Sequence, residues 1–182
     1  MAVAATSRVE YALLGLIRQG GRSGYALRKQ FATTPMGHFS DSPGSIYPAL
    51  KRMERRGLIL ARGGESGPRG KQEYTLTESG ETALRAWMTM PVGRDDVVRR
   101  IDELLLRFAF MGQVADRATV LAFIESFERE TSAYVRELRS VLQTIPDEGL
   151  PTARLALEDG LAQHQTHARW ARRSLARLRR SK

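Results

Sequence analysis

Apolar positions between residues 42 and 57 recur at the spacing of an α-helix. Ile46, Leu50 and Met53 follow one another at intervals of four and three, which places them in one stripe facing a core. Polar and basic residues occupy the opposite side. Gly57 ends the helix, because glycine tolerates the left-handed backbone that follows many helices. The segment therefore predicts an amphipathic helix with a basic outer face.

Two serines compete for the start of this helix. Ser42 is followed by Pro43, which suits a cap with proline at the first helical position. Ser45 as the cap instead places Pro48 in the first turn, where its missing N–H costs little. Both starts present hydroxyl and N–H groups at the amino end of the helix, and these groups suit contacts to phosphate.

Two short strands are predicted after this helix. Residues 58–61 form an apolar run, and residues 72–76 alternate between apolar and polar side chains, as in a half-buried strand. The tract between them is rich in glycine and carries basic residues, so it predicts a hairpin tip. A basic helix followed by a basic hairpin is the second half of a winged helix.

Further helices are predicted on both sides of this segment. A first helix spans residues 6–19, with Thr6 or Ser7 as its cap, and Ser7 and Glu10 fit a capping box. A second helix runs from Ser23 to about residue 31, and its predicted buried residues are Tyr25, Leu27 and Phe31. Thr77 caps a later helix, whose predicted core residues are Ala83, Leu84, Trp87 and Met88. This order is that of a winged helix-turn-helix.

The second half of the chain carries three long apolar stripes, which predict helices over residues 95–111, 117–143 and about 152–180. These apolar stripes are narrow, so the three helices would bury little core within one chain. A second subunit would supply the missing apolar surface, and we therefore interpret the helices as a dimerisation domain. An intramolecular bundle is the alternative. The residues predicted for a subunit interface are Val120, Ile124, Phe127, Tyr134, Leu138, Leu157, Leu161, Ala168, Ala171, Leu175 and Leu178.

Charge is distributed unevenly along the 182 residues, whose formal net charge is +9. Residues 1–90 hold 13 Lys and Arg against 7 Asp and Glu, and residues 91–168 hold 9 against 13. Residues 169–182 hold 7 basic residues and no acidic one. A basic first half favours nucleic acid as a partner. We interpret the basic tail as a solvated helix face and leave open a contact to DNA or to the acidic middle of a partner subunit.

The composition also excludes several classes of protein. There is no cysteine, so disulfides, thiolate zinc sites and cysteine nucleophiles are excluded. We expect no signal peptide, no membrane span and a cytoplasmic location. The glycine-rich tract joins two predicted strands and lacks the following helix of a phosphate-binding loop. We therefore expect a protein that is not an enzyme.

The first half of the sequence resembles the PadR family of transcriptional regulators. The residues that carry this resemblance are YALLGLI (11–17), SGYALRKQF (23–31), SPGSIYPALKRMERRGLI (42–59) and KQEYTLTESG (71–80). The resemblance implies a homodimeric repressor that binds operator DNA, with an all-helical second domain that pairs the subunits. Some members release DNA on binding a small aromatic or hydrophobic compound.

Candidate DNA contacts come from the helix, the hairpin and three tyrosines. Arg52 can make a bidentate contact to guanine, and Lys51 is more typical of a phosphate contact. The complete candidate set is Tyr25, Ser42, Ser45, Tyr47, Lys51, Arg52, Arg62, Arg69, Lys71 and Tyr74. For the three tyrosines a core or interface position is the alternative.

Two further groups could bind ligands. The aromatic and methionine side chains of the helical half offer a candidate effector pocket, formed by Phe108, Met111, Phe123 and Trp170, with plain core packing as the alternative. His164 and His167 have metal-ligand spacing on one helix, but without a second motif we interpret them as a packing pair and predict no metal or cofactor.

The sequence thus predicts a mainly α fold with a small β-hairpin. Residues 1–90 form a winged helix-turn-helix DNA-binding domain, and residues 91–182 form a helical dimerisation domain. The predicted function is a ligand-responsive homodimeric repressor that binds double-stranded DNA at a pseudo-palindromic operator. A protein–protein adaptor and a sequence-tolerant architectural DNA-binding protein are the alternatives. The effector, the operator and the regulated genes are not encoded in these patterns.

Overall fold

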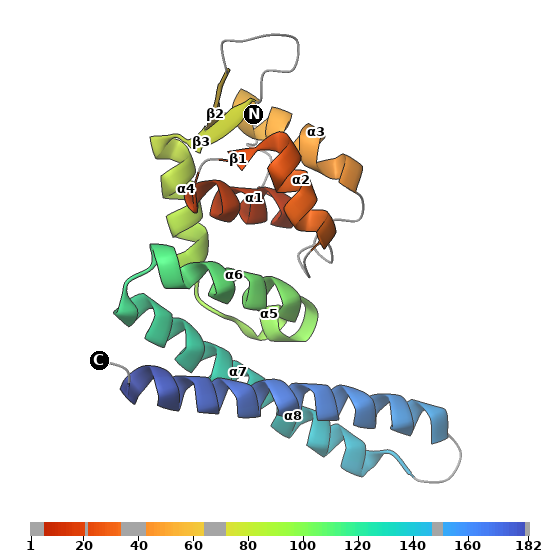
Figure 1. Cartoon of the computed structure of the whole chain (residues 1–182). Helices are drawn as coiled ribbons and strands as arrows, with labels where there is room; N and C mark the ends of the chain where they lie inside the picture. The colour runs from red at the N-terminus through yellow and green to blue at the C-terminus, as the bar shows by residue number, and fades with distance from the viewer. Residues whose placement is uncertain (1–5, 21, 34–42, 64–71, 147–150, 181–182) are drawn as a thin grey trace. The chain divides into compact units, whose positions relative to one another are not determined.

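The computed structural model describes residues 6–20, 22–33, 43–63, 72–146 and 151–180 (Figure 1). The chain divides into two compact units, Met1–Met88 and Thr89–Lys182. Helices dominate both units, and one small antiparallel sheet lies in the first. This confirms the mainly α fold class predicted from the sequence.

The first unit has the element order of a winged helix. Its elements are α1 (Arg8–Arg18), β1 (Arg22–Ser23), α2 (Gly24–Thr33), the 3-10 turn η2 (Pro43–Ser45), α3 (Ile46–Arg55), β2 (Ile59–Arg62), β3 (Glu73–Leu76) and α4 (Glu78–Thr89). The apolar faces of the helices meet in one core, whose fully buried side chains include Leu13, Leu16, Leu27, Phe31, Ile46, Leu50, Met53 and Leu84.

Helix α1 begins with the predicted capping box. The Ser7 Oγ accepts a hydrogen bond from the Glu10 backbone N–H (3.3 Å), and Glu10 Oε2 accepts one from the Ser7 N–H (2.9 Å). Two of the N–H groups at the start of the helix are therefore paired within one turn.

Helix α2 corrects one predicted core residue. Leu27 and Phe31 are buried as predicted, but the Tyr25 side chain is 62% exposed. The buried stripe of α2 starts at Gly24, which leaves Tyr25 on the outer side of the helix. Ser23 caps the helix through a hydrogen bond from the Ala26 N–H to its Oγ (3.2 Å).

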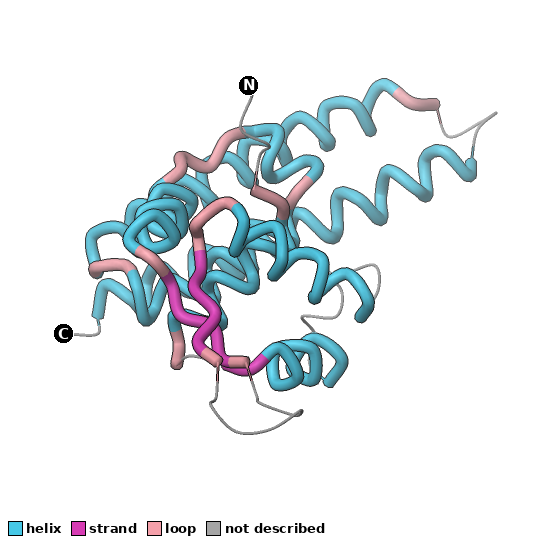
Figure 2. The backbone as a smooth tube through the Cα atoms, turned by 90° about the horizontal axis from the view of Figure 1, so that it is seen from above, coloured by secondary structure: helices cyan, strands magenta, loops and turns pink. Residues whose placement is uncertain are grey.

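The two predicted strands pair as an antiparallel hairpin, and a third strand extends it to a sheet in the order β1-β3-β2 (Figure 2). In the hairpin, Ile59 lies opposite Leu76 and Arg62 lies opposite Glu73. Strand β1 has only two residues, and its Arg22 lies opposite Tyr74. So short a strand has no periodicity to read, which explains why it was not predicted.

Helix α3 starts at Ile46, after the 3-10 turn, and Ser45 is its N-cap residue. Ser45 therefore holds the predicted cap position, with Pro48 in the first turn, although its hydroxyl makes no capping hydrogen bond. Ser42, the other predicted cap, lies outside the described residues. The end of the helix is as predicted. Gly57 has φ +65°, and the Leu58 N–H reaches back to the Met53 carbonyl (2.9 Å), a pattern that closes many helices.

The start of helix α4 packs closely against the turn after α3 and is hydrogen-bonded to it. Thr77 Oγ1 accepts a hydrogen bond from the Gly80 N–H (3.0 Å) and donates one to the Gly57 carbonyl (2.6 Å). A Cβ at Gly80 would lie 2.0 Å from the Leu58 carbonyl oxygen, so this close approach requires glycine. Further along, Trp87 stacks on Tyr11 of α1, with ring centroids 4.7 Å apart.

The second unit is all-helical, with α5 (Arg94–Arg99), α6 (Ile101–Val114), α7 (Arg117–Thr144) and α8 (Pro151–Arg180). The sequence predicted one helix over residues 95–111, and this prediction is wrong because the structure has two helices there, α5 and α6. The backbone breaks at Arg100 (φ −137°, ψ 32°), whose guanidinium bonds the Asp96 carboxylate (2.5 Å). Val97 and Met111 are buried nevertheless. An apolar stripe fixes which side chains face inward but not whether the backbone stays continuous.

Helices α7 and α8 pack side by side along much of their length (Figure 1). Of the residues predicted for a subunit interface, six are already buried within a single chain: Ile124, Phe127, Leu138, Leu161, Ala168 and Ala171. The other five are partly exposed: Val120, Tyr134, Leu157, Leu175 and Leu178. The alternative of packing within one chain accounts for the first group.

None of the helices in the described residues is long and apolar enough to cross a bilayer.

Candidate nucleic-acid interface

The outer face of α3 is an exposed polar stripe. Tyr47, Lys51 and Arg55 recur at intervals of four, so they lie one above another on the helix. The Tyr47 side chain is 45% exposed, and Lys51 and Arg55 are also exposed. The inward side of α3 is fully buried, which fixes the rotation of the helix about its axis. The stripe therefore faces outward from the core of the first unit.

Arg55 was not among the predicted DNA contacts. The signal was present in the sequence. Residues four apart share a helix face, and Arg55 follows Lys51 at that distance on the side opposite the apolar stripe.

Tyr47 and Tyr74 have different positions, although both were predicted to contact DNA. The Tyr74 side chain is only 7% exposed, and its hydroxyl donates to Gln72 Oε1 (3.3 Å). Burial raises the pKa of this hydroxyl, with smaller contributions from Glu54 and Tyr47. A Cβ at Gly24 would lie 3.0 Å from the Tyr47 ring and 3.6 Å from the Tyr74 ring. Tyr74 is thus a core residue behind the exposed Tyr47.

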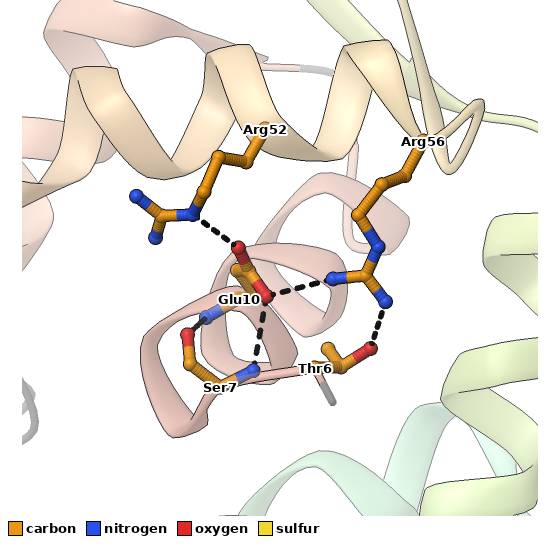
Figure 3. Close-up of polar contacts among 5 residues, drawn as sticks. All are labelled: Thr6, Ser7, Glu10, Arg52 and Arg56. Atoms are coloured by element: carbon orange, nitrogen blue, oxygen red, sulfur yellow. Dashed lines mark hydrogen bonds and ion pairs between the residues drawn. The ribbon is translucent and has the colours of Figure 1, made fainter. Parts of the chain in front are cut away.

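A buried carboxylate connects α1 to α3 (Figure 3). The Glu10 side chain is 2% exposed, and Oε1 accepts a hydrogen bond from Arg52 Nε (3.0 Å). Oε2 accepts one from Arg56 Nη1 (3.1 Å), and Arg56 Nη2 donates to Thr6 Oγ1 (2.8 Å). The carboxylate that caps α1 therefore also fixes two arginines of the helix that carries the exposed stripe.

This cluster changes the role predicted for Arg52. Only its Nε is used by Glu10, and Figure 3 shows its two terminal nitrogens pointing away from the carboxylate. The side chain of Arg52 is 46% exposed, so these nitrogens reach solvent beside the stripe. Glu10 itself was predicted only as a capping residue. A local motif explains its contact to Ser7, but no local pattern indicates partners 42 and 46 residues away.

The remaining predicted contacts are only partly described. Arg62 is exposed at the end of β2, beside the hairpin. Ser45 is half-buried at the start of α3, and Tyr25 is exposed on α2. Ser42, Arg69 and Lys71 lie outside the described residues. The described part of the candidate interface is therefore α3 with its flanks.

Residues 13–86 match the model of the transcriptional regulator PadR-like family. The first unit is a PadR-like domain. Residues 102–179, in the second unit, match the model described as virulence activator alpha C-term.

Two curated relatives align with parts of the chain. The negative transcriptional regulator PadR of Bacillus subtilis is 34% identical over 104 residues, which are 57% of this chain and 56% of that protein. The transcriptional regulator YqjI of Escherichia coli is 34% identical over 68 residues, 37% of this chain and 31% of that protein. The chain thus spans little more than half of the first relative and about a third of the second.

Solved structures of similar proteins cover more of the chain. Bacillus subtilis PadR in complex with operator DNA covers 93% of this chain and 98% of its own, at 26% identity and a TM-score of 0.41. The PadR-like regulator BC1756 from Bacillus cereus covers 98% and 99%, at 26% identity and a TM-score of 0.43.

The aromatic residues predicted as an effector pocket lie outside the PadR-like domain and pack on one another. Phe108 lies 5.7 Å from Phe123 and 5.4 Å from Trp170, measured between ring centroids, and Met111 is fully buried. The Arg107 guanidinium lies 4.5 Å from the Phe123 ring, and burial lowers the pKa of Arg107 to about 10. These contacts are those of core packing, the alternative stated for this group.

His164 and His167 also belong to the second unit. The ring of His164 packs edge-on against Tyr134, with centroids 4.8 Å apart. Burial lowers the pKa of both histidines. The charge of His167 lowers the pKa of His164 further, and Asp102 opposes the shift at His167. Among the described residues, no three His, Asp or Glu side chains lie close enough together to hold a metal ion.

Proposed function

We propose that this chain is a DNA-binding transcriptional regulator whose helix α3 reads base edges in the major groove. The observation that carries the proposal is the exposed stripe of Tyr47, Lys51 and Arg55 on a helix whose other side is fully buried. Lys and Arg are the residues that most often contact guanine in that groove. A hydroxyl at Tyr47 adds a donor for phosphate.

The flanks of α3 suit contacts to the DNA backbone. The terminal nitrogens of Arg52 form a fork that can bind a phosphate in two places, because Glu10 occupies only Nε. Arg62 is exposed at the end of β2, and we expect it to contact the adjacent DNA backbone or minor groove. Several phosphate contacts in each copy predict an affinity that falls steeply as salt increases.

Repression is the direction of regulation that we favour. One curated relative, 34% identical over 104 residues, is named a negative transcriptional regulator. A repressor of this kind is not an enzyme, and it works by occupying its operator.

We further propose that two copies pair through the second unit. The buried seam of α7 and α8 is already satisfied within one chain, so pairing must use other surface. Val141 near the end of α7 is 48% exposed, and Leu155 near the start of α8 is 62% exposed. Two recognition helices in successive major grooves would lie about 34–36 Å apart. Light scattering tests this pairing: Val141→Glu with Leu155→Glu should shift the wild-type dimer to a monomer.

A small hydrophobic or aromatic effector remains part of the proposal. The rings of Phe108, Phe123 and Trp170 would receive such a compound only if they separate, because they contact one another in the structure. Trp170 fluorescence in a titration with an aromatic acid would report this opening, and an unchanged spectrum at saturating concentration would contradict it.

The decisive experiment compares specific with random DNA. The full chain is titrated into labelled DNA from upstream of its own gene, and into a shuffled sequence of equal length. A specificity ratio of about 1,000 or more at physiological salt supports a sequence-specific regulator. A ratio near one indicates an architectural protein that coats DNA, and no binding to either duplex indicates a protein–protein adaptor.

A further inference from the structure

An open, arginine-lined hollow lies between α7 and α8, and the proposed function does not use it. Its volume is about 380 Å³, within the range of ligand sites. Each helix contributes four residues at the spacing i, i+3, i+4 and i+7, so each presents one face to the hollow. The lining residues are Ser132, Val135, Arg136 and Arg139 from α7, and Gln165, Ala168, Arg169 and Arg172 from α8.

The floor of the hollow is apolar and closed. Val135 is 7% exposed and Ala168 is 2% exposed, and both lie where the two helices pack together. The small side chain of Ala168 leaves space above it. The arginines rise from both sides of this floor, which distinguishes the hollow from a solvated basic face on one helix.

One arginine is anchored at the end of the hollow. Arg172 Nε donates to Glu128 Oε1 (2.9 Å), and Arg172 Nη2 donates to Ser132 Oγ (3.3 Å). Because α7 and α8 run antiparallel, this pairing of Ser132 with Arg172 places Arg136 opposite Arg169.

The other three arginines are not neutralised by the chain in this way. Among the described residues, no carboxylate lies within ion-pair distance of Arg136, Arg139 or Arg169, and Arg169 donates only to Thr166 Oγ1 (3.0 Å). These three exposed arginines line one hollow, so their guanidinium groups repel one another, and a bound anion would reduce that repulsion. Planar guanidinium forks match carboxylate and phosphate oxygens in pairs.

We propose that this hollow binds a small polyanion carrying at least two carboxylate or phosphate groups. Arg136 and Arg169 hold one acidic group between the two helices, and Arg139 holds the second. The Gln165 side-chain amide at the other end can donate a further hydrogen bond, whereas the Ser132 hydroxyl already donates to Glu128 Oε1 (2.8 Å). The site belongs entirely to the second unit, so it does not depend on the DNA-binding face.

Calorimetric titration of the full chain tests this site with two probes, citrate and pyrophosphate, at constant ionic strength. We expect saturable binding of one probe molecule per chain, and the tighter probe identifies carboxylate or phosphate as the preferred group. Acetate, with one carboxylate, should give no saturable heat. Absence of saturable binding for both polyanions would overturn the proposal.

Two matched variants locate the binding. Arg136→Gln with Arg169→Gln should weaken binding about tenfold or more, because each lost bond involves two charged groups. The control, Arg129→Gln with Arg173→Gln, removes the same charge from exposed positions of α7 and α8 outside the hollow. Equal weakening in both variants would mean diffuse attraction, and the site would be rejected. Loss of binding in Lys51→Gln with Arg55→Gln would place the anion on α3 and would also reject it.

Discussion

Glu10 Oε1 accepts a hydrogen bond from Arg52 Nε over 3.0 Å, which joins the start of α1 to the last turn of α3. The carboxylate is buried, and its other oxygen binds Arg56 and the Ser7 N–H. A buried charge is stable only when it is paired and hydrogen-bonded. The same residue therefore caps one helix and holds the orientation of another.

Replacing Glu10 should destabilise the first unit. Glu10→Ala removes the cap and leaves two arginines without their partner, so we expect a loss of about 3 kcal/mol in unfolding free energy. Glu10→Gln keeps one acceptor oxygen but no charge, and should lose less. Urea unfolding in a Trp170→Phe background measures this, because Trp87 then reports the first unit alone. A change below about 0.5 kcal/mol for Glu10→Ala would show that the cluster contributes little.

Gly80→Ala tests the close approach of α4 to the turn after α3. The added Cβ would meet the Leu58 carbonyl oxygen at 2.0 Å, so the backbone must shift, at a cost of about 1–3 kcal/mol. Gly160→Ala is the matched control, since nothing lies within 4 Å of a Cβ at that helical position. The control should raise stability by about 0.5–1 kcal/mol. Similar effects of both substitutions on the melting temperature would contradict the packing described.

The two histidines of α8 predict a pH dependence of stability. Burial lowers the pKa of His164 and His167 in the folded chain, whereas a histidine of the unfolded chain keeps its ordinary pKa of about 6.5. Below that pH the unfolded chain therefore binds more protons than the folded chain. Stability is therefore full above that value and falls as the pH drops through the folded pKa values. Denaturant unfolding at pH 7.5 and 5.5 should show this fall, and His164→Gln with His167→Gln should flatten it. An unchanged slope in the double variant would assign the dependence to other groups.

Arg52→Ala separates a base contact from a phosphate contact. If its terminal nitrogens read a base, affinity for the operator falls and the preference at one base pair relaxes. If they bind a phosphate, specific and random DNA lose affinity equally and the salt dependence becomes shallower by about one ion. Because Glu10 fixes Nε, the position of Arg52 beside the stripe favours the phosphate contact. Competition with operators changed at single positions distinguishes the two outcomes.

Much of the fold follows from local patterns in the sequence. The Ser7–Glu10 capping box, the Gly57 stop and the buried stripe of α3 each depend on residues within a few positions of one another. Sequence periodicity did not predict two features of the backbone that have no repeating pattern. Strand β1 is too short to show a period, and the break at Arg100 leaves the apolar spacing of Val97 and Met111 intact.

The candidate interface was predicted less completely than the fold. Exposure of Tyr47 and Lys51 follows from helical spacing, but burial of Tyr74 depends on packing beside Gly24. The contacts of Glu10 to Arg52 and Arg56 require α1 and α3 to cross at their observed places. Long-range contacts of this kind depend on the assembled core, so a single sequence does not reveal them.

The most direct test of the account is DNA binding by Lys51→Gln with Arg55→Gln, measured by fluorescence anisotropy on DNA from upstream of the chain's own gene. The control is Arg173→Gln with Arg180→Gln, which removes the same charge from exposed positions of α8. We predict that the α3 variant loses affinity by about 100-fold or more, since each contact contributes about 1–3 kcal/mol, while the control changes it little. An α3 variant that binds as tightly as the wild-type chain would contradict the assignment of this helix as the DNA reader.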